Sequence, residues 1–141
     1  MADKKASESF TAEEKAAMRQ RAKELKENAT REEDAKAVLD AIAAMKPADR
    51  AIAERVHAVV IAAAPQLAPK TWYGMPAYAL DGKIVCSLKP SDKFKERYST
   101  FGFNDPAQLD DGTMWPVSFA ITSLSAANEK QIAALVTKAV G

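Results

Sequence analysis

The chain has 141 residues, with 20 lysines and arginines against 19 aspartates and glutamates, for a formal net charge of +1. This length suits a single domain with its own core, which needs neither a disulfide nor a metal to fold. The near-neutral charge disfavours nucleic acid as a partner of the whole surface. A single cysteine excludes an internal disulfide and a zinc site built from several thiolates.

The N-terminal segment carries no sign of regular structure or of export. Residues 1–9 lack periodicity and are predicted to be a disordered lead-in. They also lack the apolar core of a signal peptide, and no apolar run in the chain reaches the length of a bilayer span. The sequence therefore predicts a cytoplasmic protein without a membrane segment.

Three helices are predicted in the first half of the chain. Thr11 begins a capping-box pattern and predicts a helix over residues 11–28, whose narrow apolar stripe indicates a peripheral position. Thr30 repeats the pattern and predicts a second helix that ends before Pro47. Its apolar stripe consists of Ala35, Val38, Leu39, Ile42 and Met45. A third helix ends before Pro65, with a predicted buried stripe of Ile52, Val56, Val59, Val60 and Ala63.

The pattern then changes to the period of two residues that is typical of strands. The dipeptide Asp81-Gly82 predicts a two-residue type I′ hairpin, because both central positions of that turn need positive φ. In the resulting register Tyr78 pairs with Val85. The predicted core face carries Ala77, Ala79, Ile84, Cys86 and Leu88. The predicted wet face carries Tyr78, Leu80, Lys83, Val85 and Ser87.

Two more strands and a helix complete the chain. Residues 98–103 alternate again, residues 104–115 form a polar loop, and residues 117–122 form a fourth strand. Ser125 caps a final helix with the stripe Ile132, Leu135, Val136 and Ala139. The predicted fold class is α+β in one domain, residues 1–141: N-terminal helices, a roughly four-stranded, mainly antiparallel sheet and a C-terminal helix.

Several stretches resemble the YdhG-like family of uncharacterised bacterial proteins. The stretches that carry the resemblance are Phe10–Glu14, Lys70–Tyr78, Lys93–Lys95, Tyr98 with Thr100–Phe103, Leu109–Gly112 and Met114–Pro116. The resemblance covers nearly the full chain and implies a small α+β domain. The family has no established activity, and some members are labelled iron chaperones by analogy to frataxin. The resemblance assigns no catalytic residue.

Amphipathic aromatic residues around the predicted hairpin are the first candidate site. A large apolar body with one polar group suits a pocket for a small ligand or for a side chain of a partner, although such residues also fill cores. Gly74 and Pro76 interrupt a good strand pattern and indicate a bulge or an edge strand beside this set. The members are Trp72, Tyr73, Met75, Tyr78, Tyr98 and Trp115.

A basic cluster with aromatic residues follows the hairpin. Cations with interleaved rings are typical of proteins that bind single-stranded nucleic acid. Here Asp92 and Glu96 dilute the cluster, which favours a charged connection between strands. The basic members are Lys89, Lys93, Lys95 and Arg97, and the aromatic members are Phe94 and Tyr98. Lys93 or Arg97 is expected to anchor an anionic group.

Metal binding and catalysis find little support. The one histidine, His57, falls on the flank of its helix near Arg50 and Glu54, and the aspartates of residues 105–111 lack the spacing of a calcium loop. Cys86 is predicted to point into the core, where a thiol behaves as a small hydrophobe. No nucleophile elbow, phosphate loop or paired carboxylate motif is present, so no cofactor is predicted.

The sequence thus favours a non-enzymatic domain that binds a small apolar or aromatic ligand, or a protein partner, on the wet face of its sheet. The candidate ligand-binding residues are Trp72, Tyr73, Met75, Tyr78, Lys93, Arg97, Tyr98 and Trp115. Frataxin-like iron binding and an unrecognised small-substrate enzyme are the alternatives. The oligomeric state is left open between monomer and homodimer.

Overall fold

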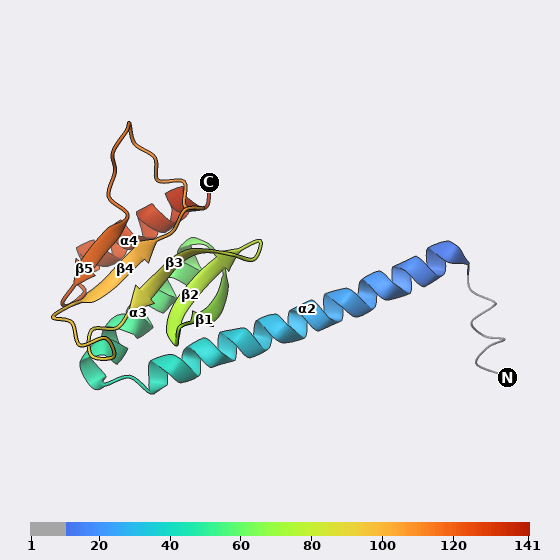
Figure 1. Ribbon diagram of the computed structural model, residues 1–141, viewed down its shortest axis with the longest axis horizontal. Coiled ribbons are helices and arrows are strands. Elements are labelled where there is room, and N and C mark those ends of the chain that lie inside the picture. The colour runs from blue at the N-terminus through green and yellow to red at the C-terminus, as the bar shows by residue number, and fades with distance from the viewer. Residues whose placement is uncertain (1–10) are drawn as a thin grey trace. The chain divides into compact units, whose positions relative to one another are not determined.

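The computed structural model describes residues 11–141, except for the side chains of residues 27–29. The predicted lead-in, residues 1–9, lies outside the described residues. Two compact units, residues 1–33 and residues 34–141, make up the chain and are described separately. The elements in chain order are α2 (Ala12–Ala43), α3 (Pro47–Ala63), β1 (Ala68–Trp72), β2 (Met75–Leu80), β3 (Lys83–Lys89), β4 (Ser99–Phe103), β5 (Ser118–Ile121) and α4 (Ala126–Ala139) (Figure 1).

Helix α2 is continuous, whereas the sequence predicted a break between Asn28 and Thr30. Thr11 accepts a hydrogen bond from the Glu14 N–H (3.1 Å), so the predicted cap at the helix start is confirmed. Thr30 lies inside the helix and its hydroxyl donates to the Lys26 carbonyl (3.0 Å), so the second predicted cap is wrong. The physical reason is that α2 contains no glycine or proline that would end it.

Only part of the apolar stripe predicted for the second helix is buried. Val38 and Ile42 lie in the hydrophobic core, whereas Leu39 is 54% exposed. Every described side chain from residue 11 to residue 33 is exposed. Within the described part of the chain, no helix is both long enough and apolar enough to cross a membrane.

Helices α3 and α4 lie against one face of the sheet (Figure 1). Ser125 caps α4 by accepting from the Asn128 N–H, and the Asn128 side chain accepts from the Ser125 N–H in return, which confirms the predicted start. Six residues of the predicted stripes are buried: Ile52, Val56, Val60, Ile132, Val136 and Ala139. The predicted Val59, Ala63 and Leu135 are half-buried, and α3 also buries Asp49 and Ala53, which were not predicted. The predicted α+β class with a C-terminal helix is therefore confirmed.

The open sheet has five strands in the order β1-β2-β3-β4-β5, each antiparallel to its neighbours. The predicted hairpin is confirmed: Leu80 pairs with Lys83, and Asp81 and Gly82 have φ of 52° and 80°. The sequence predicted about four strands. The additional strand is β1, which pairs along its whole length with β2.

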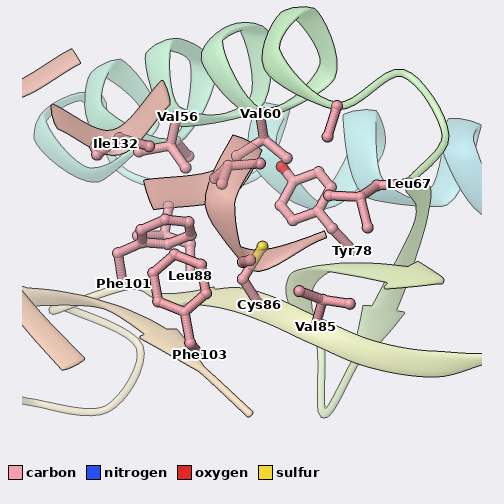
Figure 2. Close-up of a cluster of buried hydrophobic side chains, with 14 of the residues drawn as sticks. Val56, Val60, Leu67, Tyr78, Val85, Cys86, Leu88, Phe101, Phe103 and Ile132 are labelled. Atoms are coloured by element: carbon pink, nitrogen blue, oxygen red, sulfur yellow. The ribbon is translucent and has the colours of Figure 1, made fainter. Parts of the chain in front are cut away.

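A β-bulge explains why several residues of the hairpin were assigned to the wrong face. Tyr78 pairs with Cys86 rather than with Val85, and the register then shifts so that Ala79 pairs with Ile84. Val85 is the extra residue on β3. Tyr78 therefore lies on the helix-covered face and is fully buried, not on a wet face as predicted (Figure 2).

Four other predicted core residues of the sheet meet beneath α3 and α4. Figure 2 shows Cys86, Leu88, Phe101 and Phe103 gathered on this face. Cys86 and Leu88 were predicted there correctly, and Phe101 and Phe103 share one face as their alternation indicated. In contrast, Ala77, Ala79 and Ile84 were predicted on the core face and do not belong to this core cluster. Val85 was predicted on the wet face and is buried in the cluster, and Leu80, also predicted there, packs against it.

The first half of the loop between β4 and β5 is held against the end of α4. The Gln108 N–H donates to the Ala139 carbonyl at the end of α4 (2.8 Å), and Leu109 is buried. Met114, further along, is exposed. The Phe103 N–H donates to the Val117 carbonyl (2.7 Å), which brings the chain into β5.

Candidate ligand-binding site at the β1–β2 turn

The turn that joins β1 to β2 is a second type I′ hairpin turn. Trp72 pairs with Met75, and the two residues between them, Tyr73 and Gly74, have φ of 51° and 74°. Gly74 therefore marks a turn, not the predicted bulge or edge. A residue other than glycine costs roughly 1 kcal/mol in this left-handed region. Tyr73 carries that strain while 78% exposed, so burial does not compensate for it.

Lys93 lies directly over this turn. Its Nζ donates to the Tyr73 carbonyl (3.3 Å), and a Cβ added at Gly74 would collide with the same nitrogen. Glycine at this position therefore serves two purposes: it adopts positive φ, and it leaves space for the lysine. The contact links the β1–β2 turn to the loop of residues 90–98, at one end of the sheet.

Asp49 fixes that loop to the first turn of α3. Its carboxylate is buried and accepts hydrogen bonds from the Ser91 hydroxyl (2.7 Å) and from the Asp92 N–H (2.9 Å). Lys46 adds an ion pair with Asp92 (3.2 Å). Ser91 also donates its N–H to the Ser99 hydroxyl oxygen (3.2 Å). Because the buried carboxylate has partners for both oxygens, Asp49 acts as a structural anchor of the loop.

A cavity of about 480 Å³ lies between this loop, the β1–β2 turn and the end of α2, all within residues 34–141. We call it the tip cavity. Its wall combines apolar side chains and backbone with two lysines and two aspartates. The lining residues are Ala41, Ala44, Met45, Lys46, Asp49, Gly74, Pro90, Asp92 and Lys93.

Cations and rings also pair along the loop, as the basic cluster in the sequence indicated. The ammonium groups of Lys89 and Lys93 lie 5.2 Å and 5.8 Å from the centre of the Phe94 ring. The Arg97 guanidinium lies 5.2 Å from the centre of the Tyr98 ring. These distances are within the range of cation–π attraction, which holds the side chains near the loop rather than extended into water.

The structure brings some of the predicted site residues together. The rings of Trp72 and Tyr73 are 5.3 Å apart, Met75 pairs with Trp72, and Lys93 contacts the same turn. Arg97 and Tyr98 form their own pair further along the loop of residues 90–98.

Two predicted site residues lie elsewhere. Tyr78 is in the core, where its hydroxyl is hydrogen-bonded to Nδ1 of His57 (2.9 Å). Trp115 precedes β5, whose first residue pairs with Gly102 near the end of β4. This is the opposite end of the sheet from the loop of residues 90–98, which leads into the start of β4. Trp115 is half-buried and packs against the core there.

The part of the cavity wall contributed by α2, α3 and the residues between them was not predicted from the sequence. Ala41 lies in the last turn of α2, Ala44 and Met45 follow directly after that helix, and Asp49 lies in the first turn of α3. The one local signal in the sequence was Asp49, three residues after Lys46, because the first turn of a helix favours a negative charge. The position of Asp49 in a helix does not reveal that the loop of residues 90–98 covers its carboxylate.

His57, Tyr78 and Cys86 lie close together where α3 meets the sheet. Burial lowers the pKa of His57, and burial together with the nearby Cys86 raises the pKa of Tyr78. Burial raises the pKa of Cys86 to about 12. A thiol with that pKa is protonated at neutral pH, as expected from its predicted core position. Among the side chains that the structure describes, no three His, Cys, Asp or Glu residues are grouped so that they could hold a metal ion.

No protein-family model, curated protein or solved structure matches the chain. The resemblance to the YdhG-like family therefore stays a prediction.

Proposed function

We propose that this protein is a non-enzymatic binding domain of the YdhG-like family, and that its ligand is a small molecule with an apolar body and one anionic group. The observation that carries the proposal is the tip cavity, where Ala41, Ala44 and Met45 provide apolar surface near Lys93. Its volume of about 480 Å³ falls in the range of small-molecule sites, roughly 300–1,000 Å³.

The charges around the cavity favour an anionic group near Lys93. Lys46 and Asp92 neutralise each other in an ion pair, and both oxygens of Asp49 accept hydrogen bonds from the loop. The hydrogen bond that Lys93 makes goes to a neutral carbonyl, that of Tyr73. An ammonium group has three donors, so Lys93 retains donors for a carboxylate or phosphate oxygen.

The aromatic rim supplies the second part of the proposed specificity. Trp72 and Tyr73 stand beside Gly74, which lines the cavity, and Tyr73 is almost fully exposed in a strained backbone conformation. Strained, exposed aromatic residues that contribute no burial to the fold are more often kept for recognition than for stability. We expect their rings to cover the apolar body of a bound ligand. No described feature favours iron handling or enzymatic activity over ligand binding.

Octanoate is a suitable first probe because it combines an alkyl chain with one carboxylate. In amide NMR spectra of the ¹⁵N-labelled protein, we expect octanoate to shift Met45, Gly74 and Lys93 in a saturable way. Octylamine, which has the same chain and the opposite charge, should not. Lys93→Gln should weaken octanoate binding about fivefold, or roughly 1 kcal/mol, the value of a partly exposed charge-assisted contact.

Lys95→Gln is the matched control, because it removes the same charge from the same loop at a residue outside the cavity lining. It should leave octanoate binding unchanged. Equal weakening by both substitutions would show only general attraction of anions to the loop. No saturable shift with octanoate, or an equal response to octylamine, would contradict the proposal.

A further inference from the structure

The free edge of β5 is a second surface that the ligand site does not use. Among the described residues, β4 is the one strand that pairs with β5, and Phe119 pairs there with Phe101 (Figure 1). The Val117 carbonyl accepts from the Phe103 N–H. The backbone N–H and C=O groups of alternate residues point to the same side of a strand. Those of Val117 and Phe119 therefore point to β4. Those of Ser118 and Ala120 then point away from the sheet.

This edge lacks the protection that the opposite edge has. β1 contains Pro69, which has no N–H to offer, and the charged Lys70. Both features hinder the addition of another strand. β5 reads Ser118-Phe119-Ala120-Ile121 and contains neither proline nor charge, so its short length is its one defence against pairing.

An uncharged groove with both apolar and neutral polar side chains runs beside this edge, between β5 and α4; Asn128 and Gln131 are among the polar ones. Its volume is about 240 Å³. Phe119, Ile121 and Leu124 line it on the strand side, and Ile132 and Leu135 on the helix side. No lining residue is ionisable, although 28% of the residues in the chain are charged. Covering the groove therefore buries the surface of these apolar side chains without desolvating a charge.

We propose that a second copy of the chain occupies this edge, with the two β5 strands antiparallel across a two-fold axis at Ala120. In this register Ala120 pairs with Ala120 of the second copy, and Ser118 pairs with Thr122 of the second copy on either side. The backbone groups that point away from each sheet then bond to each other. The two five-stranded sheets become one continuous sheet.

The chemistry of the edge favours a second copy over an unrelated strand because the edge complements itself. Two uncharged edges approach without like-charge repulsion, and Ser118, Ala120 and Thr122 are small enough to lie side by side on one face. On the other face, Phe119 and Ile121 of each copy lie over the uncharged groove of the other. Each copy therefore supplies both the groove and the side chains that cover it. This inference does not depend on the ligand site.

The first test measures mass in solution. Sedimentation equilibrium of the full chain should give twice the monomer mass of 15.2 kDa as concentration rises toward the millimolar range. Ala120→Lys places two ammonium groups beside each other at the axis and should weaken association at least about tenfold. Ala120 is exposed in the single chain, so the lysine fits there. Thr71→Lys, at an exposed position on the opposite edge strand, is the control and should leave the dimer intact.

The second test determines the register in which the two β5 strands pair. It does not depend on whether the Ala120→Lys variant folds. A mixture of Ser118→Cys and Thr122→Cys proteins should form a disulfide-linked dimer under mild oxidation, because those positions face each other across the axis. Either protein alone should crosslink much more slowly, and the buried Cys86 does not compete. A monomer at all concentrations, a dimer that survives Ala120→Lys, or equal crosslinking in all three samples would each overturn the proposal.

Discussion

Tyr78 links the two layers of the core through a single polar contact. Its ring is fully buried, and its hydroxyl is hydrogen-bonded to His57 on α3 at 2.9 Å. Burial, with a smaller contribution from Cys86, raises the pKa of Tyr78, so the phenol stays neutral across the physiological range. His57 is half-buried, and burial lowers its pKa from the usual 6.5. The pair is therefore favoured by the fold in its uncharged form.

This arrangement predicts how stability depends on pH. Because the pKa of His57 is lower in the folded chain, the unfolded chain binds a proton first as pH falls through about 6.5. The free energy of unfolding should therefore fall between roughly pH 7 and pH 5, and the contribution of His57 should be absent above that window. Urea unfolding across this pH range measures the effect. His57 is the one histidine of the chain, so the window is free of other imidazoles.

His57→Gln is the control for this prediction. Glutamine does not titrate, so the variant should lose most of the decline in stability between pH 7 and pH 5. An unchanged decline in His57→Gln would show that carboxylates, not the imidazole, set the pH dependence.

At this same residue scale, sequence alternation located some core residues and misplaced others. Cys86 and Leu88 were predicted on the core face and lie there, because they are two residues apart on one strand. Tyr78 was assigned to the wrong face because Val85 is an extra residue in β3, and a one-residue shift moves every residue on one side of it to the other face. No residue type in this hairpin signals a bulge, so the register needed the structure.

At the scale of elements, the two threonines of α2 have opposite roles. Thr11 caps the helix start, and Thr30 lies inside the helix with its hydroxyl bonded to the Lys26 carbonyl. Thr11→Ala should therefore lower helicity and cost about 1 kcal/mol of helix stability, the usual value of a lost cap. Thr30→Ala should raise helicity by a few tenths of a kcal/mol, because alanine is the better helix former.

Circular dichroism at 222 nm during thermal melting measures both effects. The comparison separates one continuous helix from two consecutive helices, because in the second case Thr30 would be a cap as well. A loss of helicity in Thr30→Ala that matches the loss in Thr11→Ala would therefore contradict the continuous helix.

The β1–β2 turn shows a limit of turn chemistry in sequence. Asp81-Gly82 was identified because aspartate tolerates positive φ, whereas tyrosine at Tyr73 gave no such signal. Tyr73-Gly74 nevertheless forms the same type of turn, and β1 was missed as a consequence. The residues on the two sides of that turn, Trp72 and Met75, were still chosen as site candidates, because their chemistry was visible without the turn.

At the scale of the whole molecule, the candidate site depends on contacts that are distant in sequence. Lys93 reaches the Tyr73 carbonyl, and Asp49 holds the loop of residues 90–98 that carries Lys93. Local pattern can propose Tyr73 and Lys93 as binding residues, as it did here. It cannot show that Met45 and Asp49 complete their cavity, because that depends on how α2 ends and α3 begins beside the sheet.

The distribution of buried residues predicts that the core lies in one part of the chain. All described buried residues lie between Val38 and Ala139, and every described side chain of residues 11–33 is exposed. A chain that begins at Asp34 should therefore keep the cooperative unfolding of the full protein, with little change in its thermal midpoint in calorimetry. Val38→Ala in the full chain is the contrasting variant, because a cavity at this fully buried position should cost about 2 kcal/mol. If the shortened chain unfolds without cooperativity, or loses more stability than Val38→Ala, then residues 1–33 contribute to the fold in a way that burial does not capture.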